Sequence, residues 1–169
     1  MDIIPQDEEW TDNYRWDRRS KRKFSLEVNR ASKIEYQILE LWLNAVEREQ
    51  STRPSYIETG CDNTGAFLEK ATTRADYHVE GYGFIEIKFS RPKKTKYFHL
   101  KVRQVKSYIK QKAKILFVNG WSTDNPQYTI LTTHRLKTLD ERCKTITFKG
   151  FGNKVSYRIP ITMLFWRSL

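Results

Sequence analysis

The chain has 169 residues, which is enough for one domain with a substantial apolar core. Its 31 Lys and Arg exceed its 20 Asp and Glu, and the net charge of +11 at pH 7 favours a polyanionic partner, either a nucleic acid or an acidic membrane surface. No apolar run approaches the ~20 residues of a membrane-spanning helix, and the acidic first residues are unlike a signal peptide. We therefore expect a cytoplasmic protein without a membrane partner.

The N-terminal region divides into two parts. Residues 1–24 turn from acidic to basic and are predicted to be a basic arm or leader. A helix is predicted over residues 25–49, because five apolar residues fall on one helical face: Ile34, Ile38, Leu41, Trp42 and Ala45. The Arg53-Pro54 step closes this region, since a residue before proline disfavours the helical conformation.

The middle of the chain alternates strands with a helix. Residues 55–73 are rich in turn residues, with one short strand predicted at 56–58. Two strands, 75–80 and 84–89, flank Gly81-Tyr82-Gly83 and predict a hairpin. A basic loop over 91–96 precedes a helix predicted at 100–112 and a buried strand at 115–118.

Beyond residue 120 the pattern favours further strands. They are predicted at 128–132, 145–148 and 155–159, with a short helix over 135–142. The whole is interpreted as one α+β domain over residues 25–169, with a core at 25–120 and C-terminal strands at 121–169.

The cysteines and histidines give no sign of a zinc or nucleophile site. Cys61 and Cys143 lie far apart and form no C-x-x-C pair, so both are interpreted as reduced thiols. His78, His99 and His134 lack metal-ligand spacing. Histidine-metal nucleases and Ser-His-Asp hydrolases are therefore disfavoured.

The strand over residues 84–89 carries the most informative charges. Glu86 and Lys88 share one face, because strand side chains alternate. Asp76 lies ten residues upstream of Glu86, on the other strand of the predicted hairpin. Two converging carboxylates can hold Mg²⁺ while leaving positions for water and phosphate oxygens. Lys88 can then position a water or neutralise charge on a phosphate.

These residues resemble the PD-(D/E)XK nuclease superfamily. The pattern is Asp76, nine residues, then Glu86-Ile87-Lys88 inside an apolar strand, with Ala75 where the family often has proline. The resemblance implies a restriction-endonuclease-like core, a central mixed β-sheet flanked by helices. It also implies catalytic roles for Asp76, Glu86 and Lys88, and Mg²⁺ bound by Asp76 and Glu86, for which Mn²⁺ can substitute.

The same resemblance implicates residues on the two predicted helices. A carboxylate on the first helix often completes the family's metal site, and Glu35 is the candidate, with Glu40 as the alternative. Gln104 and Tyr108 match the QxxxY motif of RecB-like branches, and residues four apart share a helix face. Gln104 is therefore a candidate catalytic residue, and Tyr108 is expected to face either the site or DNA.

A long cationic stretch follows the motif. No Asp or Glu occurs from Ile87 to Thr123, which is unusual for an ordinary solvated helix face. Such density suits phosphate contacts that position DNA without reading its sequence. With Tyr108, the predicted DNA contacts are Arg91, Lys93, Lys94, Lys96, Lys101, Arg103, Lys106 and Lys110.

The sequence thus predicts a Mg²⁺-dependent endonuclease that hydrolyses double-stranded or branched DNA. A phage or mobile-element nuclease of the homing type, acting in bacterial or phage-infected cytoplasm, is the first interpretation. A Holliday-junction resolvase of the same superfamily and a non-catalytic nucleic-acid-binding protein remain the alternatives. Because cutting two strands requires two sites or two visits, we expect a homodimer.

Overall fold

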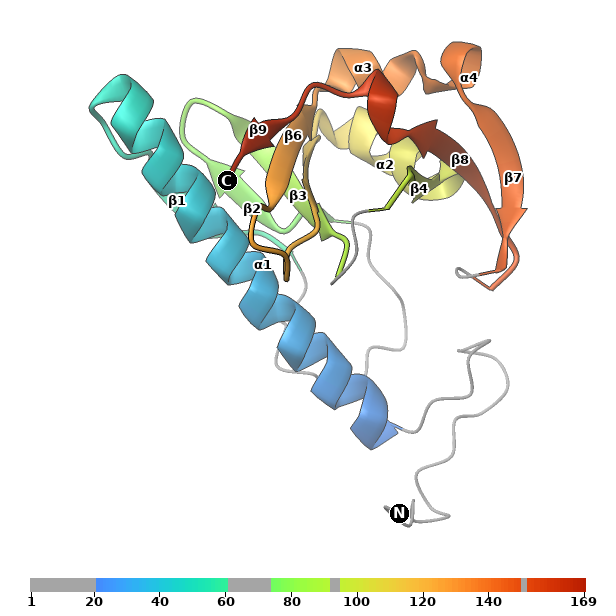
Figure 1. Cartoon of the computed structure of the whole chain (residues 1–169), viewed down its shortest axis with the longest axis horizontal. Coiled ribbons are helices and arrows are strands. Elements are labelled where there is room, and N and C mark those ends of the chain that lie inside the picture. The colour runs from blue at the N-terminus through green and yellow to red at the C-terminus, as the bar shows by residue number, and fades with distance from the viewer. Residues whose placement is uncertain (1–20, 61–73, 92–94, 150–151) are drawn as a thin grey trace.

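The computed structural model describes residues 21–60, 74–91, 95–149 and 152–169. The predictions for residues 1–20, Cys61, Lys93 and Lys94 lie outside these ranges. The architecture is α+β, with a mixed six-stranded sheet, a separate three-stranded sheet and flanking helices, which confirms the predicted class (Figure 1).

The longest element is the helix α1, Lys21–Gln50. It begins four residues before the predicted start and so takes in the end of the expected N-terminal arm. Its C-terminal half packs on the six-stranded sheet, whereas its first turns extend past it (Figure 1). Burial follows this geometry, because Ile38, Leu39 and Trp42 are buried while Leu26 is half exposed.

The six-stranded sheet has the order β1-β2-β3-β5-β6-β9. Its central pair, β3 and β5, is parallel, and the other neighbours are antiparallel. The predicted hairpin is present, with Tyr77 opposite Ile85, and Gly81 and Gly83 supply positive φ angles of 76° and 77°. The strands are β1 Tyr56–Glu58, β2 Tyr77–Val79, β3 Gly83–Phe89, β5 Lys114–Asn119, β6 Gln127–Leu131 and β9 Arg167–Ser168.

The three-stranded sheet is antiparallel, with the order β4-β8-β7. Its strands are β4 Tyr97–Lys101, β7 Lys144–Phe148 and β8 Lys154–Pro160. The remaining helices are α2 Val102–Gln111, α3 Thr133–Lys137, α4 Leu139–Arg142 and a 3₁₀ turn, η3, Ile161–Met163. None of the helices in the described residues is long and apolar enough to cross a bilayer.

Two predictions for this region were wrong. The helix expected from Leu100 begins at Val102, because Leu100 belongs to β4, a strand that was not predicted. The helix expected over 135–142 is two short helices that meet at Thr138, whose φ of −87° and ψ of 1° leave the helical range.

Two apolar clusters hold the layers together. On one face of the large sheet, Ile85 and Ile87 of β3 pack with Leu39 and Trp42 of α1. On the other face, Phe117 and Ile115 of β5 pack with Tyr108 of α2 and the inner side of the small sheet. The large sheet therefore lies between α1 and a layer made of α2 and β4-β8-β7.

Candidate active site

The candidate site lies where β3 extends beyond the end of its neighbour β2. The pairing of β2 with β3 ends at Tyr77 opposite Ile85. If the register continued by one residue, Asp76 would stand opposite Glu86. Asp76 lies just before β2, and its Oδ2 accepts a hydrogen bond from the backbone N–H of Ile87 at 2.8 Å. A carboxylate thus takes the place of a strand carbonyl at the open edge of β3.

The backbone around Asp76 is held from several sides. Gln111 Oε1 on α2 accepts from the N–H of Ala75 at 3.1 Å, and the hydroxyl of Thr59 donates to the carbonyl of Ala75 at 2.9 Å. The N–H groups of Thr59 and Gly60 both donate to the carbonyl of Asp76, at 2.8 and 3.0 Å. A Cβ on Gly60 would stand 3.1 Å from the Asp76 Cα, so this close approach favours glycine.

Glu86 and Lys88 point to the α2 side of β3, on the opposite face from Ile85 and Ile87. Glu86 is only 6% exposed. Its Oε1 accepts from the hydroxyl of Tyr108 at 2.8 Å and from the Lys88 ammonium in a short ion pair. The buried carboxylate is therefore compensated by one neutral and one charged donor, as burial of a charge requires.

The carboxylates at this edge repel one another. The pKa of Asp76 is raised to about 8, first by burial and then by the charges of Glu86 and Glu35, against the opposite effects of Lys88 and the Ile87 N–H. Burial lowers the pKa of Lys88, but the negative charge of Glu86 and its neighbours outweighs this and raises it overall. Lys88 is thus a cation at neutral pH, whereas Asp76 holds its proton until about pH 8, and a divalent ion bound here would displace that proton.

The structure separates the two helix glutamates. Burial raises the pKa of Glu35, and the charges of Lys88 and Glu86 act on it, so α1 brings Glu35 to the site. Glu40 instead forms a 2.6 Å ion pair with Arg53 and accepts a long hydrogen bond from Tyr56. Of the two glutamates, Glu35 is therefore the one that lies near Asp76, Glu86 and Lys88.

The two residues of the QxxxY motif have different environments. Tyr108 is 1% exposed and contacts Glu86, which corrects the expectation that it contacts DNA. Gln104 is half-buried, and its side chain forms no hydrogen bond with the residues that the structure describes. Sequence reasoning missed Gln111, Thr59 and Gly60. They hold Asp76 through hydrogen bonds to backbone groups of Ala75 and Asp76, which leave no recognisable pattern in the sequence.

Most of the predicted DNA contacts lie at the surface. Arg91 and Lys96 flank the connection from β3 to β4, and Lys101 is half-buried at the end of β4. On α2, Arg103, Lys106 and Lys110 are exposed, and their spacing places them along one side of the helix.

The donor set fits a hard cation with few protein ligands. Asp76 Oδ1 and Glu86 Oε2 accept no hydrogen bond from the residues that the structure describes. Within the same residues, no three Asp, Glu, His or Cys side chains form a ready-made metal cluster. Mg²⁺ commonly binds through one or two carboxylates and completes its shell with water and phosphate oxygens, which matches this arrangement.

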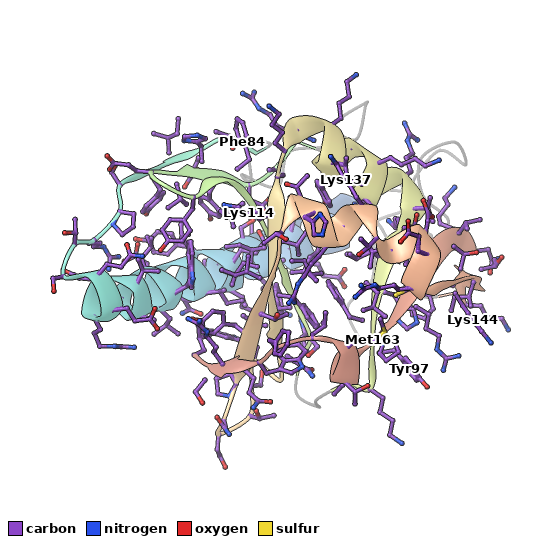
Figure 2. All side chains as sticks on the ribbon, turned by 90° about the horizontal axis from the view of Figure 1, so that it is seen from above. Phe84, Tyr97, Lys114, Lys137, Lys144 and Met163 are labelled. Atoms are coloured by element: carbon purple, nitrogen blue, oxygen red, sulfur yellow. The ribbon has the colours of Figure 1, made fainter. Side chains whose placement is uncertain are left out.

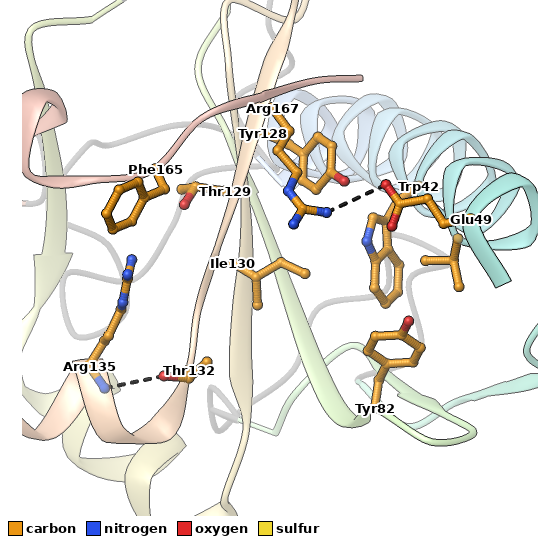
Figure 3. Close-up of a pocket in the computed structure, with 11 residues that line it drawn as sticks. Trp42, Glu49, Tyr82, Tyr128, Thr129, Ile130, Thr132, Arg135, Phe165 and Arg167 are labelled. Carbon is orange, nitrogen blue, oxygen red and sulfur yellow. Dashed lines mark hydrogen bonds and ion pairs between the residues drawn. The ribbon is translucent and has the colours of Figure 1, made fainter.

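A pocket of about 310 Å³ lies apart from this site, between the C-terminal half of α1 and the edge of β6 (Figure 3). Its wall includes Trp42 and Tyr82, which meet edge to face with ring centroids 5.0 Å apart. At its mouth Arg167 pairs with Glu49 at 3.5 Å. None of the predicted catalytic residues lines it.

In comparisons with known proteins, no family model matches the chain, and no curated protein or solved structure is significantly similar to it.

Proposed function

We propose that this protein is a Mg²⁺-dependent endonuclease of the PD-(D/E)XK type, with a restriction-endonuclease-like core, that hydrolyses phosphodiester bonds in DNA. One observation carries the proposal. Asp76 and Glu86 lie together at the open edge of β3, each with an oxygen free of any donor among the described residues, beside a protonated Lys88.

Each side chain has a distinct part in the proposed reaction. Asp76 and Glu86 would hold the ion, and Glu35 would add negative charge near it. A bound Mg²⁺ would stabilise charge on the scissile phosphate and supply an activated water. Lys88 is a cation, so it stabilises the charge that develops on the phosphate rather than removing a proton. Tyr108 holds Glu86 in place.

The surrounding charge supports DNA as the substrate. Arg91 lies just after β3 and Lys96 just before β4, and α2 exposes further cations. Phosphate contacts of this kind position a polyanion without specifying its sequence. Cleavage of both strands would require two such sites, and we therefore propose a homodimer as the active form.

Single substitutions at the three central residues test the proposal. Asp76→Asn, Glu86→Gln and Lys88→Met should each lower Mg²⁺-dependent cleavage by about 100-fold or more, with duplex binding in EDTA retained within a few-fold. Lys112→Ala, an exposed residue at the end of α2, is the matched control and should cut normally. Duplex, junction and single-stranded substrates should be compared side by side, since a junction preference would indicate a resolvase and a site-specific duplex cut a homing or restriction enzyme.

A second candidate, a non-catalytic DNA-binding protein, is favoured by one observation. Glu86 accepts from both Lys88 and Tyr108, so its buried charge has protein partners without a metal. If the wild-type protein binds DNA tightly but cuts none of the substrates with Mg²⁺ or Mn²⁺, this second function replaces the first.

A further inference from the structure

We propose that the outer face of the β4-β8-β7 sheet is a second DNA-contact surface that extends the candidate active site. The outer face is defined here as the side turned away from the core. The inference rests on the proposed function and assigns a role to the C-terminal third of the chain, for which the sequence predicted strands and a short helix but no function.

Register and burial separate the two faces of this sheet. Phe98 and Leu100 of β4 and Tyr157 and Ile159 of β8 are buried against the core. Because side chains alternate along a strand, the residues between them point outward. With the observed pairing, the outward positions are Tyr97, His99, Lys101, Lys144, Ile146, Phe148, Lys154, Ser156, Arg158 and Pro160, of which Ser156 is fully buried.

The charge on this face has one sign. None of the three strands contains an Asp or Glu. Lys144, Lys154 and Arg158 are exposed, and none of them forms an ion pair with the residues that the structure describes. Figure 2 shows Lys144 and Tyr97 at the end of the molecule that this sheet forms. A face with cations and no acids is complementary to a chain of phosphates.

The pairing itself places like charges together. Arg158 stands directly opposite Lys144 on one side and His99 on the other. Like charges directly opposite each other destabilise a sheet, so this row costs stability in the free protein. Burial and the charge of Arg158 lower the pKa of His99, which removes part of that repulsion. A phosphate over the row would relieve the remainder.

Ring contacts hold the cationic row in a fixed arrangement. The Arg158 guanidinium lies 3.8 Å from the centroid of the Tyr97 ring. His99 stacks on Phe148 with the rings nearly parallel and their centroids 4.0 Å apart. Side chains that are ordered before binding lose less conformational entropy when a ligand binds. The Arg158 guanidinium is thus already positioned before an anion binds.

The start of β4 is tied close to the end of β3, the strand that carries Glu86 and Lys88. The chain passes from β3 to β4 through the segment that begins with Ser90 and ends with Lys96. Asn119, at the end of β5, fixes both ends of this segment, because its Oδ1 accepts from the Ser90 hydroxyl at 2.8 Å and from the Thr95 N–H at 2.9 Å. The first residue of β4 is therefore held near the end of the catalytic strand, and one DNA molecule can contact both.

The test is a double substitution compared with a charge-matched control. Lys144→Gln with Arg158→Gln removes two cations from the face, and Lys137→Gln with Arg142→Gln removes two exposed cations from α3 and α4. Binding of a fluorescent 30-base-pair duplex is measured in EDTA over a range of salt concentrations, so the readout does not depend on cleavage. Thermal melts check that each variant is folded.

We expect the first pair to weaken binding by about ten-fold or more and to lower the slope of log K against log salt by about 1.8, or 0.9 for each phosphate that the protein no longer neutralises. The control pair should change the slope by much less. Equal effects in both pairs would overturn the proposal, because only net charge would then matter. If catalysis is absent but the first pair alone loses affinity, the DNA-contact surface stands and the proposed nuclease function fails.

Discussion

The Asp76 carboxylate accepts a hydrogen bond from the backbone N–H of Ile87 at 2.8 Å, two residues along β3 from Ile85, where its pairing with β2 ends. This hydrogen bond connects the two halves of the sequence motif. It fixes Asp76 beside Glu86 without using the second Asp76 oxygen. Among the described residues a carboxyl group, rather than another strand, takes the Ile87 N–H, and burial makes the ionised form of that carboxyl costly in the absence of a cation.

The first prediction concerns pH and the stability of the metal-free protein. The pKa of Asp76 is about 8 in the folded state against 3.8 ordinarily, so the folded protein binds more protons than the unfolded chain between these values. The contribution of Asp76 to the free energy of unfolding should therefore be highest below about pH 4 and fall as pH rises towards 8. Asp76→Asn should flatten this dependence and be more stable than wild type at pH 8, as measured by urea unfolding.

Two other groups with shifted pKa values, Glu35 and His99, also affect how stability depends on pH. Glu35 contributes in the same direction because its pKa is also raised, and His99 in the opposite direction because its pKa is lowered. Both are present in wild type and variant, so the difference between the two curves reports Asp76 together with its coupling to Glu35 and Glu86. At pH 8, Mg²⁺ at ten times its dissociation constant should add about 1.4 kcal/mol to wild type, or roughly 3–5 °C in Tm. An equal Mg²⁺ shift in Asp76→Asn would show that Asp76 is not a ligand.

The sequence predicted the parts of the fold that local pattern determines. The long helix, the glycine hairpin and β5 all follow from apolar periodicity or turn residues. The strand β4 was missed although Phe98 and Leu100 alternate with polar residues, because the cationic run and the helix that follows at Val102 mask a strand of this length. Its partner β8 lies more than fifty residues away along the chain, and such distant pairing leaves no local signal.

The candidate site likewise combines residues that local sequence patterns predict with residues that only distant contacts place there. Asp76, Glu86 and Lys88 were found because strand alternation and a hairpin fix their relation, and Tyr108 because it matches the QxxxY motif of the family that the sequence resembles. The roles of Gln111, Thr59 and Gly60 depend on backbone groups of Ala75 and Asp76, which any residue type would offer. Only the three-dimensional structure reveals such contacts. The choice between Glu35 and Glu40 likewise depended on which one has Arg53 as a neighbour.

The second prediction separates these two glutamates. Glu35→Gln should weaken Mg²⁺-dependent cleavage by about ten-fold or more, because it removes negative charge near the ion. Glu40→Gln should lose about 0.5–1 kcal/mol of stability with its Arg53 ion pair and keep its Mg²⁺ dependence. Mg²⁺ titrations of cleavage and thermal melts measure both effects. The reverse outcome, with impaired Glu40→Gln and normal Glu35→Gln, would reassign the site on α1.

The third prediction concerns the two residues of the QxxxY motif. Tyr108→Phe removes a buried hydrogen bond to a carboxylate, so it should cost about 1.5–3 kcal/mol in unfolding free energy and slow cleavage. Gln104→Ala should change both by little, because Gln104 forms no side-chain hydrogen bond with the described residues. Urea unfolding and single-turnover cleavage provide the measurements. A Gln104→Ala protein that binds DNA but does not cut it would instead make Gln104 catalytic.

The last prediction concerns how Asp76 is positioned. Gln111→Ala leaves the N–H of the fully buried Ala75 without its acceptor, which should lower the free energy of unfolding by about 1–3 kcal/mol. It should also slow cleavage, because the backbone beside Asp76 is then held by fewer hydrogen bonds. Gln111→Glu keeps an acceptor and should recover part of both losses. Lys112→Ala, an exposed neighbour at the C-cap of the same helix, is the control and should have neither effect.

Comparing the two Gln111 variants decides between positioning and simple destabilisation. If Gln111 acts by holding Ala75, cleavage at a temperature where every variant is fully folded should follow the order wild type, Gln111→Glu, Gln111→Ala, and the Mg²⁺ concentration for half-maximal rate should rise in the same order. If this hydrogen bond contributes only to stability, all folded variants should cut at the wild-type rate. That result would leave the hydrogen bonds from Thr59 and Gly60 as sufficient to fix Asp76.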